Sequence, residues 1–177
     1  MKRLIWAAAA SAAIPLLVWS QAGGPYAGQE SRRIKSLSEA EVRAYLEGRG
    51  MGLAKPAELN GYPGPMHVIE LADRLHLSEA QRAQAQESFG RMRAEAVRLG
   101  KLIVEKEAEL DRLFAETKVN PENLRSKVSE IAGLQGELRV VHLRAHLEMK
   151  RALSPEQVRR YDELRGYGGE HDTRQHK

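Results

Sequence analysis

Two long helical segments, separated by a short break, constrain the fold of this chain more than any other feature of its sequence. From residue 78 to residue 116 there is no proline, and apolar residues recur in alternating steps of three and four, with one skipped position at Lys106. Such spacing is a heptad seam, and it predicts an amphipathic helix that packs along a partner helix. The seam residues are Phe89, Met92, Ala96, Leu99, Ile103, Leu110 and Leu113.

A second segment, residues 121–151, repeats the same spacing. Asn120 can cap its first turn, and Pro121 stands where a missing amide hydrogen costs nothing. Because the connection is short, the two helices should run antiparallel as neighbours. The sequence therefore predicts an all-α fold built on a long helical hairpin. The seam residues of the second helix are Leu124, Val128, Ile131, Leu138, Val141, Ala145 and Met149.

Shorter capped helices are expected on both sides of the hairpin, over residues 38–47, 66–75 and 154–164. In the first of them Ser38 can accept an early amide hydrogen bond, while Glu41 reaches back to complete a capping box. The alternating β-branched stretches typical of strands are missing, and only 5% of residues are aromatic. Both observations favour a helical array over a sandwich or a barrel.

A five-residue box of the form Leu-Ser-x-x-Gln occurs twice. In each copy the serine can cap a helix, the glutamine can reach back to the cap, and the leucine can pack against the helix. Residues 37–41 form a close third copy, with Glu41 in place of glutamine. We interpret the boxes as helix-cap motifs, made by Leu77, Ser78, Gln81, Leu153, Ser154 and Gln157.

The first 22 residues have the pattern of a secretory signal. Lys2 and Arg3 precede an apolar run that extends to Trp19, and small residues occupy the positions before the expected cleavage site. We expect cleavage near Gly23 and a periplasmic protein with no membrane span after cleavage. Removing Lys2 and Arg3 lowers the formal net charge from +4 to +2, which argues against a general nucleic-acid binder.

The sequence predicts one helical domain with additional segments before and after it. Residues 48–65 carry the densest glycine and proline content, and they are interpreted either as a connector or as an arm that packs on the helical body or reaches a second subunit. No chemical role is assigned to them. The expected divisions are a signal peptide over 1–22, a flexible leader over 23–36, a short helix and Gly/Pro-rich arm over 37–65, the helical domain over 66–165 and a polar tail over 166–177.

With its two boxes flanking a cysteine-free hairpin, the sequence resembles the Spy/CpxP family of periplasmic helical proteins, whose recurrent element is Leu-Thr-x-x-Gln. Ser78 and Ser154 replace the threonine but keep its hydroxyl group. The resemblance covers residues 66–165. The family includes ATP-independent chaperones that act as cradle-shaped antiparallel dimers, stress-signalling regulators, and heavy-metal sensing or resistance proteins. The resemblance therefore implies a cradle-like homodimer and a function in the stress response.

An enzyme is not expected. The chain has no cysteine, its serines lie mostly at helix caps, and its histidines form no nucleophilic constellation with them. The glycines of residues 48–52 lack the Gly-Lys-Ser/Thr ending of a phosphate loop. The abundant carboxylates alternate with lysine and arginine, as on the solvated face of a helix.

A chaperone that binds unfolded protein clients is the first functional hypothesis. Long thin helices leave apolar positions beside the seam, and basic residues lie among them, a combination that suits the capture of exposed apolar segments. The same leucines could instead form a dimer interface that the arginines only solvate. The candidate client-binding residues are Arg91, Arg98, Leu102, Arg139, Leu143 and Leu147.

A heavy-metal site is the second hypothesis. His142 and His146 lie one helical turn apart, which suits a shared zinc, copper, nickel or cobalt ion, and Met149 lies on the next turn. The match to the metal-sensing relatives is incomplete, because Ala145 stands where they carry a histidine four residues before the methionine. Further ligands would have to come from a second subunit or from His67, His171 and His176. Otherwise His142 is a hydrogen-bonded histidine near the seam and His146 a surface residue.

A third possibility is a regulatory module that binds the sensory domain of a membrane kinase. No residue or motif of the sequence separates this function from that of a chaperone.

Overall fold

The computed structural model describes residues 24–167, and the chain divides into two compact units between Glu30 and Ser31. The second unit holds every helix described below. In chain order these are α1 (Glu39–Leu46), α2 (Lys55–Glu58), α3 (Pro65–Glu70), α4 (Glu79–Ala115), α5 (Pro121–Ala152) and α6 (Pro155–Arg165). No strand occurs within residues 24–167, so the predicted all-α class is confirmed. The expected signal segment over 1–22 and the histidines of the tail lie outside the described residues.

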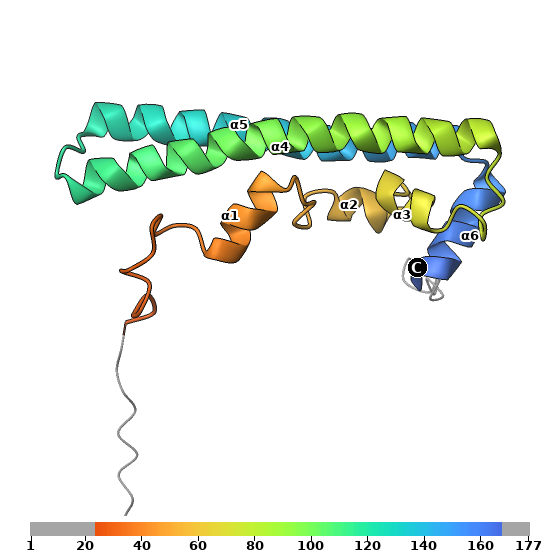
Figure 1. Ribbon diagram of the computed structural model, residues 1–177, viewed down its shortest axis with the longest axis horizontal. Helices are drawn as coiled ribbons and strands as arrows, with labels where there is room; N and C mark the ends of the chain where they lie inside the picture. The colour runs from red at the N-terminus through yellow and green to blue at the C-terminus, as the bar shows by residue number, and fades with distance from the viewer. Residues whose placement is uncertain (1–23, 168–177) are drawn as a thin grey trace, which may run out of the picture. The chain divides into compact units, whose positions relative to one another are not determined.

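Helices α4 and α5 form the predicted antiparallel hairpin, and they lie side by side along their length (Figure 1). The Asn120 side chain accepts hydrogen bonds from the amides of Glu122 at 3.0 Å and Asn123 at 2.9 Å, which confirms it as the cap of α5. Seam residues from both helices make the central core of the hairpin, namely Ala96, Leu99, Ile103, Leu138 and Val141.

Ion pairs join the two helices where the seam of α4 skips a position, beside the buried Ile131 of α5. Lys106 Nζ lies 3.1 Å from Glu109 and 3.3 Å from Glu130 on α5, and Lys127 pairs with the same two carboxylates. The hydrogen bond from Lys127 is the main reason why the pKa of Glu109 is lowered. The distal part of the hairpin is therefore joined across the two helices by charges, and Val128 there is 49% exposed.

The two Leu-Ser-x-x-Gln boxes bind each other, a contact that we name the glutamine clasp. Gln81 Nε2 donates to Gln157 Oε1 at 2.8 Å, and Gln157 Nε2 donates to Gln81 Oε1 at 3.0 Å. Each amide nitrogen also donates to a backbone carbonyl, that of Ala152 at 2.9 Å or that of Leu75 at 3.2 Å. Each amide oxygen also accepts the backbone amide of its own serine cap, so both side chains use their full bonding capacity.

An apolar cluster lies beside the clasp, at the end of the hairpin where α4 begins and α5 ends. Both box leucines are only 7% exposed and belong to it, which gives them a packing role beyond the local staple. Contacts to α3 and α6 complete it. This foot cluster consists of Val68, Ala72, Leu75, Leu77, Ala85, Met149, Leu153, Val158 and Tyr161.

The helix expected over residues 66–75 is shorter in the structure. Helix α3 ends at Glu70, and turns carry the chain to the cap of α4, with His76 at a positive φ of 51°. In a continuous helix Leu75 and Leu77 would point to different sides. The turns instead place both leucines in the foot cluster, and burying both of them explains why the helix stops early.

Residues 31–67 fold back along the hairpin (Figure 1). Helix α1 crosses α4 where Gly100 lies, and a Cβ atom on Gly100 would stand 2.1 Å from the carbonyl oxygen of Tyr45. Ile34 and Leu37 are buried against Val104, so contact with the hairpin begins inside the segment that we expected to be a flexible leader. The Gly/Pro-rich segment also packs on the helical body, where Lys150 Nζ of α5 donates to the carbonyl oxygen of Gly61 at 2.6 Å, which is one of the two arrangements considered for an arm. Within residues 24–167, no helix combines the length and hydropathy required to cross a membrane.

The clasp predicts strong coupling between two residues that are 76 positions apart. We expect Gln81→Ala to lower the free energy of unfolding by about 2–3 kcal/mol, because it removes a cap bond and leaves part-buried groups of the clasp unpaired. In a double-mutant cycle with Gln157→Ala, the coupling energy should be about 1–2 kcal/mol. Urea unfolding followed by circular dichroism measures both quantities.

Glu41 provides the matched control, because it completes a capping box without contacting another box. Glu41→Ala combined with Gln157→Ala should give additive losses. Additive losses for Gln81→Ala with Gln157→Ala would show that the clasp makes no energetic contribution as a pair.

Candidate functional site

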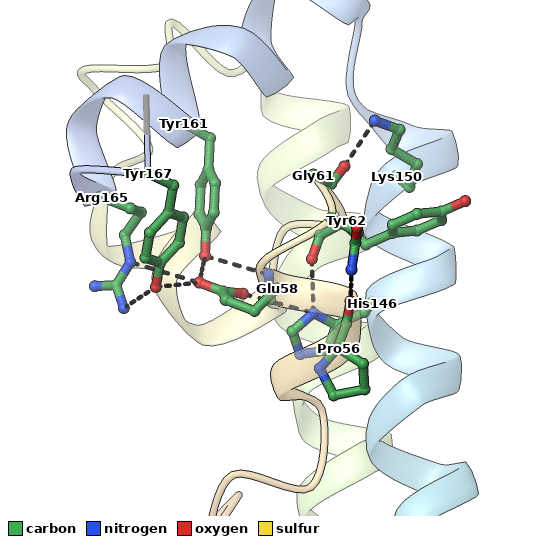
Figure 2. A network of polar contacts seen from close by, with 11 residues as sticks. Pro56, Glu58, Gly61, Tyr62, His146, Lys150, Tyr161, Arg165 and Tyr167 are labelled. Carbon is green, nitrogen blue, oxygen red and sulfur yellow. Dashed lines mark hydrogen bonds and ion pairs between the residues drawn. The ribbon is translucent and has the colours of Figure 1, made fainter. Parts of the chain in front are cut away.

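A pocket lies between the Gly/Pro-rich arm and the hairpin. It has a volume of about 820 Å³ and is bordered by residues of the arm, by α3, α4 and α5, and by the end of α6. A network of polar contacts lies where the arm meets α5 and α6 (Figure 2), and Glu58, His146, Arg165 and Tyr167 of this network also line the pocket. Three polar residues of the pocket carry the chemistry of the site: Glu58, His142 and His146.

Glu58 of α2 is the centre of the polar network (Figure 2). Its Oε1 accepts hydrogen bonds from the hydroxyl groups of Tyr161 at 2.6 Å and Tyr167 at 3.2 Å, and Arg165 Nε lies 3.5 Å away. The side chain of Glu58 is only 13% exposed. Burial, together with the hydrogen bond to Glu58, raises the pKa of Tyr161, so its hydroxyl remains a donor. One carboxylate thus fastens the arm to the C-terminal end of the structure.

His146 binds the arm from α5. Its Nδ1 donates to the carbonyl oxygen of Tyr62 at 2.7 Å and lies 3.6 Å from Glu58 Oε2. A carbonyl only accepts, so Nδ1 carries the hydrogen and Nε2 of the neutral ring holds the lone pair. A Cβ atom on Gly64 would approach this ring to 3.0 Å, so a glycine there lets the arm lie close to the histidine.

His142 lies one turn earlier on α5 and is 3% exposed. Its Nε2 atom is buried without a hydrogen-bond partner among the described residues, and so is Glu58 Oε2. Burial is the main reason why the pKa of His142 is lowered, with the neighbouring His146 as a second cause. A buried polar atom without a partner costs free energy, so a ligand that satisfies it would gain affinity.

The structure brings together two of the three residues predicted to bind a metal. His142 and His146 both line the pocket, whereas Met149 is fully buried in the foot cluster. His67 also lines the pocket, with Nδ1 2.8 Å from Glu70 Oε2. Within residues 24–167, no group of three or more His, Cys, Asp or Glu side chains is placed to hold a metal ion. The histidine pair is therefore present as an incomplete ligand set.

The predicted client-binding residues differ in their surroundings. Arg91 pairs with Glu87 and with Glu148 of α5, and Arg98 pairs with Glu95, so both guanidinium groups are already matched by carboxylates. Arg139 is exposed, Leu147 is 45% exposed, and both remaining leucines are half-buried, namely Leu102 and Leu143.

Sequence reasoning missed the residue at the centre of this site. Glu58 lies in a segment without hydrophobic periodicity, and its partners Tyr161, Arg165 and Tyr167 follow about a hundred residues later. The only local signal was the glycine and proline content of residues 48–65, which indicated an irregular backbone but no chemistry. A single carboxylate surrounded by such residues is too common in loops to be singled out.

Comparison with known proteins gives one result. A family model for heavy-metal resistance matches residues 42–160, which include the second half of α1, the arm, the hairpin and about half of α6. No curated protein and no solved structure matches the chain.

The lowered pKa of His142 predicts that acid destabilises the protein through this residue. Because the folded pKa lies below the ordinary value of 6.5, the unfolded chain binds the proton more tightly. The stability contributed by the neutral ring is full above about pH 6.5 and is lost as the pH falls toward the folded pKa. We expect His142→Gln to flatten the dependence of the free energy of unfolding on pH below 6.5, as measured by urea unfolding with EDTA present.

His76→Asn is the control, because His76 is exposed and asparagine tolerates its positive φ. That variant should keep the pH dependence of the parent protein. An unchanged slope in His142→Gln would contradict the assignment to His142.

Proposed function

Because the chain belongs to the heavy-metal resistance family, we propose that it is a periplasmic stress protein that holds unfolded polypeptides without ATP. The family supports a general function in heavy-metal resistance or in the periplasmic stress response. The signal-like pattern of residues 1–22 supports export, and no nucleotide is expected outside the inner membrane. Binding of unfolded polypeptides is the finer proposal, and it depends on the surface of the hairpin.

The observation that carries the proposal is an apolar stripe on α5, made by Val140, Leu143 and Leu147. Val140 is 55% exposed and Leu147 45% exposed, and they lie seven residues apart, which places them two turns apart on one face. Arg139 and Arg144 flank the stripe and are exposed. Apolar side chains bordered by charges can bind exposed apolar segments while the complex stays soluble.

The purified protein should suppress the aggregation of a chemically denatured client at stoichiometric ratios, as measured by light scattering without ATP. Val140→Ser combined with Leu147→Ser should remove at least half of the suppression, because it removes most of the exposed apolar surface of the stripe. Val128→Ser is a matched control, since Val128 is equally exposed but lies near the hairpin loop.

Two results would contradict this proposal. The first is unchanged light scattering at every protein-to-client ratio. The second is a double variant that suppresses aggregation fully but loses a dimer in size-exclusion chromatography, which would assign the stripe to a subunit interface.

A second candidate function, heavy-metal binding, is favoured by the two unpartnered atoms in the pocket. The lone pair of His146 lies on Nε2 because Nδ1 donates to a carbonyl, the arrangement that metal-binding histidines commonly use. His142 Nε2 and Glu58 Oε2 are buried without partners. The two histidine nitrogens fit part of the ligand set of a divalent ion such as zinc, copper, nickel or cobalt, and solvent or another chain would supply the remainder.

Calorimetric titration of these four ions tests this candidate. We expect binding that disappears in His142→Ala combined with His146→Ala and that weakens at acid pH, because imidazole must be neutral to bind a metal. The control His76→Asn should bind as the parent protein does. Binding that survives in the double variant would exclude the histidine pair as the site.

A further inference from the structure

The pocket between the arm and the hairpin has an apolar part that neither proposed function uses. Its apolar side chains come from the arm, α3 and α4: Met51, Leu59, Met66, Phe89 and Met92. A volume of about 820 Å³ lies in the range of small-molecule sites. Three of these side chains are methionines, whose flexible thioethers adapt to irregular or linear apolar ligands.

The apolar side chains that the arm and α3 contribute to the pocket remain open to solvent. Leu59 is 51% exposed, Met66 44% and Met51 40%, which places them among the most exposed large apolar residues of the described chain. Covering apolar surface gains about 25 cal/mol per Å². A ligand with an apolar body would therefore be stabilised by contact with these three side chains.

The charges that line the pocket favour an anion. Glu47 pairs with Arg49 at 2.6 Å, and Glu58 pairs with Arg165 at 3.5 Å, so these four groups neutralise one another. The lining has two further cations, Lys55 on the arm and Arg93 on α4, and both are exposed. Neither has an ion-pair partner among residues 24–167. An anion in the pocket would thus meet two cations that lack a carboxylate.

The deep part of the pocket adds a polar group that needs a partner. His142 is 3% exposed and lines the pocket, and its Nε2 atom forms no hydrogen bond within the described residues. A neutral imidazole can donate one hydrogen bond to a ligand oxygen. An apolar body, a negative charge and an oxygen acceptor are combined in a single-chain carboxylate.

We propose that this pocket binds a single-chain amphiphilic carboxylate of the fatty-acid class. The apolar chain contacts the methionines, Leu59 and Phe89, and the carboxylate pairs with Lys55 and Arg93. This inference does not rest on the holding of unfolded proteins or on a metal, and it can be tested with EDTA present.

The probe is dodecanoate, titrated calorimetrically into the full protein below its micelle concentration. We expect saturable binding of one dodecanoate per chain. Lys55→Gln combined with Arg93→Gln should weaken this binding about tenfold, because two exposed ion pairs are lost. Dodecanol, which has the same chain without the charge, should bind the parent protein and this double variant equally.

Lys101→Gln combined with Arg125→Gln is the matched control, since it removes the same charge from exposed positions outside the pocket. It should bind dodecanoate as the parent does. Both double variants alter exposed residues, and circular dichroism verifies that they fold. A third variant, Phe89→Ser, should weaken both dodecanoate and dodecanol.

Three outcomes would overturn the proposal. One is the absence of saturable dodecanoate binding. Another is equal binding of dodecyltrimethylammonium, which would show that charge plays no part. The third is binding to phosphatidylglycerol vesicles, but not to free dodecanoate, that depends on Lys55 and Arg93, which would indicate a membrane surface.

Discussion

The glutamine clasp is the interaction on which the arrangement of the other elements depends. Gln81 and Gln157 each cap their own helix and bind each other, so the start of α4 and the start of α6 cannot move apart without breaking the hydrogen bonds between the two glutamines. Their bonds to the carbonyls of Ala152 and Leu75 add the end of α5 and the turn before α4. All donors and acceptors of the two amides are used, a condition under which a buried polar contact is favourable.

The clasp also determines where the arm can bind. It fixes the direction in which α6 leaves the hairpin, and α6 carries Tyr161 and Arg165 to Glu58. With His146 holding the carbonyl of Tyr62, the arm is attached to both α5 and α6 (Figure 2). The pocket is the space left between this attachment and the place where α1 crosses α4. A site with apolar walls and a polar end therefore results from folding one irregular segment back over a regular hairpin.

The sequence predicted the parts of this structure that depend on local chemistry. Heptad spacing and the cap at Asn120 predicted the hairpin. The i,i+4 spacing of His142 and His146 predicted that they share one face of a helix, and both line one pocket. Helix boundaries agreed closely except at α3, where the burial of Leu75 and Leu77 outweighed helical periodicity.

What the sequence did not predict depends on contacts between distant residues. The boxes were recognised as two separate caps, because no local pattern says that Gln81 and Gln157 meet. Met149 has the sequence spacing of a metal ligand, but its side chain is buried in the foot cluster. Glu58 gains its partners only when the fold brings Tyr161 and Arg165 of α6 close to it. The dimer and the signal peptide remain predictions.

Gly100 has a consequence for comparing this chain with related sequences. Any side chain there would collide with the backbone of Tyr45, so the crossing of α1 over α4 requires the hydrogen atom that only glycine supplies. The residue aligned with position 100 therefore serves as a sequence marker. Relatives with glycine at this place can have the same arm over the same pocket, and relatives with a larger residue must direct their N-terminal segment along another path.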